Sequence, residues 1–163
     1  MKIAVIYMSR HGTTGKVANL IAEKLEREHP VDVMNLARFP ALSPEPYDMV
    51  IIGGSIHLGQ IQEEVRAFCE RNLELLLQKE VGLYICCLLR ERQEVQLRDA
   101  FPVKLLAHSK THACLGGEFL MERMDHEDWV VARVAAKSDR SVSKIDFQAI
   151  DKFCESLLKG IHA

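Results

Sequence analysis

Short apolar runs alternate with helical patterns along most of this 163-residue chain. The run at residues 48–54 is almost continuously apolar and ends in two glycines, which is typical of a strand covered on both faces. Similar runs occupy residues 2–7, 31–36, 81–89 and 111–120. Strands that alternate with helices predict a parallel sheet joined by right-handed crossovers. We therefore expect an α/β fold, a doubly wound sandwich with helices on both faces of a five-stranded sheet.

Helical spacing of apolar residues marks three segments between and after these runs. Residues 14–28 and 62–77 each carry one apolar stripe, and residues 145–158 close the chain as a helix with Asp146 as its N-cap. A mixed helical stretch, broken near Pro102, links the fourth and fifth runs. We expect the strand order 2-1-3-4-5, in which the loops after strands 1 and 3 meet at the carboxyl edge and form a ligand crevice.

Charge and the start of the chain limit the partners. The 21 basic and 23 acidic residues are mixed along the sequence and give a formal net charge of -2, so we expect no nucleic-acid partner. The apolar start at residues 1–7 is too short for a signal-peptide core or a membrane span. We expect a cytoplasmic protein that forms one domain over residues 1–163.

The chain contains five cysteines, an odd number, and none of them are in C-x-x-C spacing. This pattern favours reduced thiols packed in a core over a metal or disulfide site. We expect no metal site. The five are Cys69, Cys86, Cys87, Cys114 and Cys154.

The segment after the first strand has the composition of a phosphate-binding loop. Ser9-Arg10-His11-Gly12-Thr13-Thr14 stands where the N–H groups and dipole of a helix N-terminus favour an anion. The same residues also suit a simple turn and helix cap, so both interpretations remain open. The triphosphate motif requires glycine at Arg10 and Ser or Thr at Val17, and the dinucleotide motif G-x-G-x-x-G is absent. A monophosphate fits this loop better.

Residues 9–14 resemble the first loop of the flavodoxin family, T/S-x-T-G-x-T, with His11 in place of a hydroxyl residue. A closer similarity is to the flavodoxin-like, menaquinone-dependent protoporphyrinogen IX oxidases. Gly53-Gly54-Ser55-Ile56-His57-Leu58-Gly59 resembles their G-A-S-I-R-Y-G loop, and residues 114–119 and 145–147 resemble their fifth-strand segment and their entry to the last helix.

This resemblance implies a flavodoxin-like domain that binds flavin mononucleotide (FMN), with the isoalloxazine ring between residues 55–59 and residues 88–91. The expected cofactor-binding residues are Ser9, Arg10, His11, Gly12, Thr13, Thr14, Ser55, Ile56, His57, Leu58, Gly59, Leu88, Leu89 and Arg90. No catalytic dyad is evident, so the chemistry would reside in the flavin. Two interpretations of His57 remain open: a protonated side chain that would stabilise an anionic reduced flavin, and an ordinary loop residue. Arg90 and Arg92 would pair with substrate carboxylates, or only solvate the surface.

Three functions remain open on the sequence. The first is an FMN-dependent oxidoreductase with a small organic substrate and a quinone-type acceptor, and the second is an electron carrier that docks on a redox partner protein. The third is a fold that has lost its cofactor. Residues 121–140 stand where the oxidases carry an inserted helical stretch that is associated with membrane and substrate contact. Here we expect peripheral membrane contact at most, or an amphipathic helix packed on its own domain.

Overall fold

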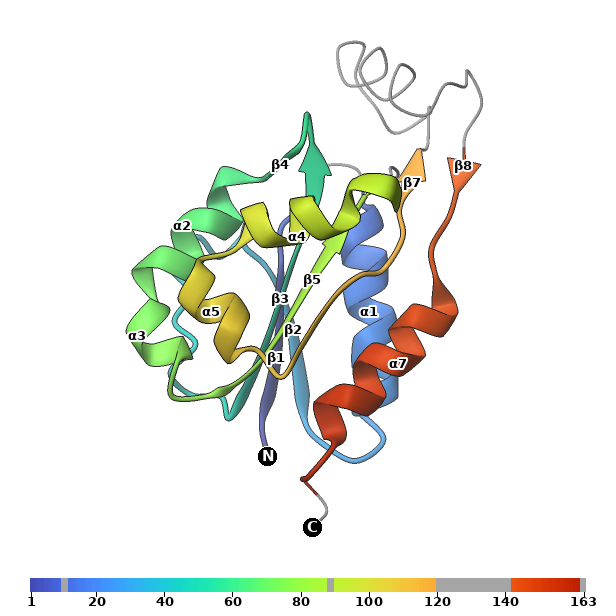
Figure 1. Ribbon diagram of the computed structural model, residues 1–163. Helices are drawn as coiled ribbons and strands as arrows, with labels where there is room; N and C mark the ends of the chain where they lie inside the picture. The colour runs from blue at the N-terminus through green and yellow to red at the C-terminus, as the bar shows by residue number, and fades with distance from the viewer. Residues whose placement is uncertain (10–11, 88–89, 120–141, 162–163) are drawn as a thin grey trace.

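The computed structural model describes residues 1–9, 12–87, 90–119 and 142–161. Its main sheet has parallel strands in the order β2-β1-β3-β5-β6 (Figure 1). The strands are β1 (Ile3–Tyr7), β2 (Val31–Asn35), β3 (Met49–His57), β5 (Glu80–Cys86) and β6 (Thr111–Cys114). Because β4 (Gln60–Ile61) is only a short antiparallel partner of β3, the order of the five parallel strands is the predicted 2-1-3-4-5.

Helices cover both faces of this sheet (Figure 1). One face carries α1 (Thr13–Leu25) and α7 (Phe147–Leu158), and the other carries α2 (Glu63–Arg71), α3 (Leu73–Leu76), α4 (Gln93–Ala100) and α5 (Val103–His108). The doubly wound α/β class is therefore confirmed. The predicted N-cap of the last helix is also confirmed, because Asp146 Oδ1 accepts a 2.9 Å hydrogen bond from the Ala149 N–H.

Two predicted elements are divided by local geometry. The helix expected over residues 62–77 is interrupted at Asn72, whose backbone leaves the helical region and whose Nδ2 donates to Phe68 O at 2.9 Å. The strand expected over residues 111–120 ends at Cys114, before Gly116 adopts a positive φ of 87°. The chain then resumes as β7 (Glu118–Phe119), which pairs with β8 (Val142–Ser143) in a separate small sheet.

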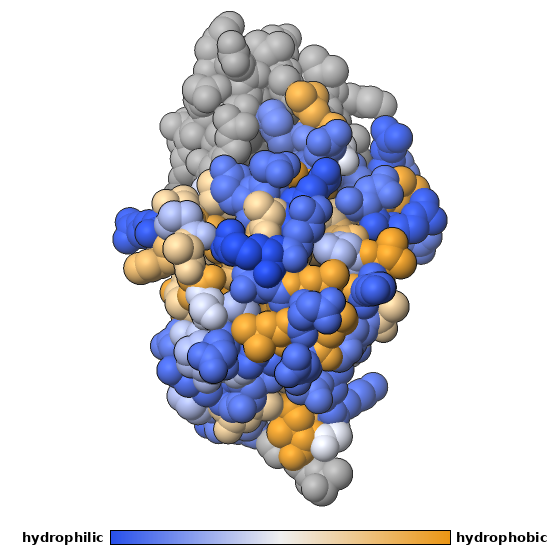
Figure 2. Space-filling view, turned by 90° about the vertical axis from the view of Figure 1, so that its left-hand side faces the viewer, coloured by the Kyte–Doolittle hydropathy of each residue, from blue (hydrophilic) through white to orange (hydrophobic). Residues whose placement is uncertain are grey.

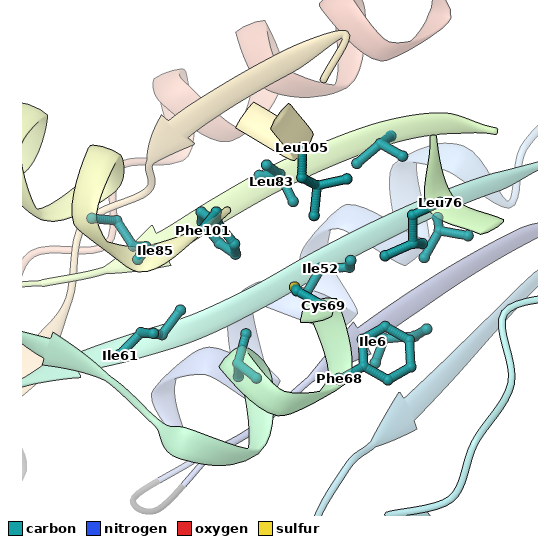
Figure 3. Packing of buried hydrophobic residues seen from close by; sticks show 14 of the residues in the cluster. Ile6, Ile52, Ile61, Phe68, Cys69, Leu76, Leu83, Ile85, Phe101 and Leu105 are labelled. Carbon is teal, nitrogen blue, oxygen red and sulfur yellow. The ribbon is translucent and has the colours of Figure 1, made fainter. Parts of the chain in front are cut away.

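The central strands are buried on both sides because their side chains alternate between two apolar cores. Val81, Leu83 and Ile85 of β5 face the core under α2, α3, α4 and α5, whereas Tyr84 and Cys86 face the core under α1 and α7. Figure 3 shows the first core, with side chains from α2 and α5 packed over the sheet. This double cover explains the near-continuous apolar runs.

The surface above α2, α3 and α5 is mainly hydrophilic, with apolar residues scattered across it (Figure 2). Among the described residues, no helix combines the length and the apolar character needed to cross a membrane.

Gly53 of β3 makes room for the largest fully buried side chain. Gly53 and Tyr84 are register partners on neighbouring strands, and a Cβ at residue 53 would lie 1.9 Å from Cζ of the Tyr84 ring. Tyr84 is fully buried and contacts Phe153 edge-on, with the ring centroids 6.1 Å apart. The absence of a side chain at residue 53 therefore determines how the second core packs beneath the carboxyl edge.

Gly53→Ala is expected to lower the free energy of unfolding by about 3 kcal/mol, because the ring cannot retreat within a close-packed core. Urea denaturation measures the loss. In a Tyr84→Val background the same substitution should cost far less, since its clashing partner is gone. An equal cost in both backgrounds would show that the ring is not the obstacle.

Candidate functional site

The loops after β1 and β3 meet at the carboxyl edge of the sheet, as the strand order predicted. The Met8 N–H donates to Gly53 O at 3.3 Å, directly beyond the last register pair of the two strands. In an open parallel α/β sheet this point, where the strand order reverses, is the usual place for a ligand. The two predicted segments thus lie beside each other.

The first loop turns sharply into α1 at Gly12. Gly12 has a positive φ of 91° and serves as the N-cap, and its N–H donates to Ser9 Oγ at 2.8 Å. The first turn of α1 contains no acidic residue. Helix geometry leaves the leading N–H groups without intrahelical acceptors, so this turn presents donors and a positive dipole end without a competing carboxylate.

Thr14 carries a buried hydroxyl in this loop. Its side chain is 1% exposed, and its Oγ1 has no hydrogen-bond partner among the described residues. A buried polar group without a partner is destabilising by about 1–3 kcal/mol. A bound phosphate oxygen would provide the missing acceptor. The turn and the helix cap are also present, because Gly12 is the N-cap and Ser9 Oγ accepts from its N–H, so the geometry of the loop agrees with both interpretations.

Tyr84 supports the same turn from below. Its hydroxyl donates to Thr14 O at 3.2 Å in a fully buried position. Burial raises the pKa of Tyr84 well above its ordinary value, so the hydroxyl keeps the proton that it donates. The ring that fills the space beside Gly53 therefore also anchors the first turn of α1.

An open pocket of about 410 Å³ lies beside this turn. The described residues that border it include one lysine and no acidic residue, which favours an anionic ligand. They are Tyr7, Ser9, Gly12, Gly15, Lys16, Asn19 and Asn35. A second pocket, of about 360 Å³, lies at the opposite edge of the sheet, and two of its lining residues are hydrogen-bonded to each other, since Lys79 Nζ donates to Tyr47 O.

The second loop is a two-residue hairpin. Ile56 and His57 at the end of β3 pair with Ile61 and Gln60 of β4. Leu58 and Gly59 form the turn with φ of 52° and 77°, the two positive values that a type I′ turn requires. The Leu58 side chain is 75% exposed, so the hairpin presents an apolar tip at the carboxyl edge.

The remaining predicted residues are placed only in part. Arg90 begins a short 3-10 helix, Arg90–Arg92, after β5. The predictions for Arg10, His11, Leu88 and Leu89, and for the segment at 121–140, concern residues outside the described ranges. Among the described residues, the structure places the start of the first loop, at Met8, beside the end of β3, at Gly53.

Gln62 links the two loops and was not predicted as a site residue. Its Oε1 accepts from the Ser55 N–H at 2.9 Å, and its Nε2 donates to Ser55 Oγ at 2.6 Å and to Met8 O at 3.3 Å. A polar residue at the start of an amphipathic helix looks like an ordinary cap in a sequence. Its role becomes evident only when the hairpin brings it back over β3.

The fold and the position of these loops define a doubly wound α/β protein with an open pocket at the carboxyl edge of its sheet. The family model described as "Flavodoxin domain" matches residues 4–148, and the chain belongs to this family. No curated protein matches the chain.

Several solved structures are similar to this chain. Oxidised flavodoxin 2 from Bacillus cereus is 19% identical, with 98% of this chain and 99% of that chain covered and a TM-score of 0.62. Rubredoxin oxygen:oxidoreductase from Desulfovibrio gigas is 16% identical, with 98% of this chain but 37% of that chain covered and a TM-score of 0.54. A mutant flavodoxin from Fusobacterium nucleatum bound to flavin mononucleotide is 21% identical over 52% of this chain and 50% of that chain, with a TM-score of 0.40.

Gln62→Leu is expected to lower the free energy of unfolding by about 1–3 kcal/mol, because it leaves partly buried groups of Ser55 and Met8 without partners. Gln62→Glu keeps the acceptor for the Ser55 N–H and should cost less. Urea denaturation provides the comparison, with Gln148→Leu on the exposed side of α7 as the matched control. Equal effects at residues 62 and 148 would contradict a linking role.

Proposed function

We propose that this chain binds FMN, with the phosphate at the first turn of α1. The observation that carries the proposal is the buried Thr14 hydroxyl, which has no hydrogen-bond partner among the described residues beside a turn that contains no acidic residue. A phosphate monoester supplies acceptors for this hydroxyl and for the leading N–H groups of the helix. Membership of the flavodoxin domain family supports FMN as the phosphate's source.

The remaining parts of the cofactor would lie along the carboxyl edge. Residues 55–59 of the β3–β4 hairpin and residues 88–90 after β5 would flank the isoalloxazine ring. When bound, FMN supplies redox chemistry, and the protein provides its position and its hydrogen-bonding environment. Gln62 would maintain the spacing between the phosphate end and the ring end, because it holds Met8 and Ser55 together.

The proposed activity is that of an FMN-dependent oxidoreductase similar to protoporphyrinogen IX oxidase, with a quinone-type electron acceptor. Support comes from residues 53–59 and 114–119, which resemble the corresponding segments of those oxidases. Residues 55–59 and 88–91 contain neither tryptophan nor tyrosine to stack on the ring. A ring without such a stacking partner would be open to an organic substrate. Arg90 and Arg92 would pair with substrate carboxylates.

Thr14→Val tests the phosphate site, because it removes the hydroxyl and keeps the shape. We expect the FMN affinity to fall by about 10- to 100-fold, the loss of one hydrogen bond to a charged group. The stability without FMN should stay the same or rise, since an unsatisfied buried hydroxyl is gone. Isothermal titration with FMN and urea denaturation measure the two effects separately.

Thr111→Val on β6 is the matched control and should leave FMN affinity unchanged, because residue 111 lies at the start of β6, away from the carboxyl edge. Unchanged affinity in Thr14→Val would place the phosphate elsewhere. If the wild-type chain stays colourless in purification and takes up no added FMN, the cofactor proposal is wrong.

Anaerobic mixing of the FMN-loaded protein with protoporphyrinogen IX tests the activity. We expect the flavin absorbance near its visible maximum to bleach, and to recover when a menaquinone analogue is added. Bleaching only in the presence of a flavodoxin reductase would instead identify an electron carrier that docks on redox proteins. The absorbance record distinguishes these outcomes without any assumption about the phosphate site.

A further inference from the structure

Two cysteine thiols lie in contact at the carboxyl edge of the sheet. Cys114 is the last residue of β6, and Cys87 directly follows the last residue of β5. Their Sγ atoms are 3.0 Å apart. Cys87 is 7% exposed, whereas Cys114, on the edge strand, is half-buried.

The backbone holds these thiols on one face of the sheet. The Leu115 N–H donates to Ile85 O, and the Cys87 N–H donates to Gly116 O, each at 3.0 Å. Cys87 belongs to the core under α4 and α5, and Cys114 packs against the same core. Since a disulfide bond is about 2.05 Å long, the two sulfurs need to approach by roughly 1 Å.

The other cysteines lack this geometry. Cys86 is next in sequence but faces the opposite core, because side chains alternate along the strand. Burial raises the pKa of Cys69 to about 12 and that of Cys154 to about 11, so both are poor nucleophiles near neutral pH. The chain thus carries one adjacent thiol pair and three cysteines with other surroundings.

We propose that Cys87 and Cys114 form a redox-active dithiol that closes to a disulfide by exchange with a low-molecular-weight disulfide. This pair is a two-electron redox site independent of the flavin. Its disulfide would join the edge strand β6 to β5 at the end of the sheet where the candidate site lies.

Cys114, the more exposed of the two cysteines, attacks first. Its thiolate forms a bond to one sulfur of the small disulfide, whose S–S bond breaks and releases one small thiolate. The Cys87 thiolate then attacks the Cys114 sulfur, the mixed disulfide breaks, and a second small thiolate leaves. The protein dithiol is oxidised by two electrons, the small disulfide is reduced to two thiols, and the protons lost from the cysteines pass to the released thiolates.

Incubation of the reduced full-length protein with oxidised glutathione, followed by intact-mass analysis, tests this order of attack. Wild type should lose two hydrogen atoms and retain no adduct. Cys87→Ala should retain one glutathione on Cys114, because the resolving thiol is missing. Cys114→Ala should react at least about tenfold more slowly, since its remaining thiol at residue 87 is nearly covered.

Cys86→Ala is the matched control and should form the cross-link as wild type does. It also assigns the bond, because residues 86 and 87 lie in one proteolytic peptide. The oxidised wild type should unfold about 5–10 °C higher than the reduced form, as expected for a cross-link that closes residues 87–114. Adducts without a cross-link, a disulfide to any other cysteine, or no change in wild type would overturn the proposal.

Discussion

The arrangement of this protein depends on the parallel pairing of β3 with β1 on one side and with β5 on the other. Both faces of these strands are covered, so their register is determined by two cores at once. A slip of one residue would move every side chain of β3 into the wrong core. The carboxyl edge, where the first loop and the hairpin meet, inherits its geometry from this constraint.

A second consequence of the pairing is that the candidate site is supported from both layers. Tyr84, in the core under α1 and α7, donates to Thr14 at the start of α1. Gln62, at the start of α2 on the other layer, holds Met8 and Ser55. Thr14, Met8 and Ser55 are thus held by residues from different layers, which agrees with the general need for preorganised sites.

The sequence allowed prediction of what depends on local pattern. The apolar runs indicate the five parallel strands, and Asp146 marks the start of the last helix because capping is a local interaction. Features that depend on contacts between distant segments were missed. The hydrogen bonds of Gln62 and the Cys87–Cys114 contact are of this kind. So is the close approach of Gly116 to Lys144 O, where a Cβ on residue 116 would lie 2.0 Å from that oxygen. The five cysteines are free thiols in or against the two cores, as the sequence predicted, and the contact between two of them is an addition to that prediction.

At the tip of the β3–β4 hairpin, the residue that the backbone favours differs from the residue that is present. A type I′ turn is best served by Asn-Gly, and a leucine with positive φ is strained by about 1 kcal/mol. Since Leu58 is largely exposed, neither the turn nor the core explains a leucine there. Replacement of Leu58 by asparagine would therefore relieve backbone strain at this turn, which lies at the carboxyl edge of the sheet. Such a change would replace an exposed apolar side chain at the tip by a polar one, while the backbone of the hairpin keeps its conformation.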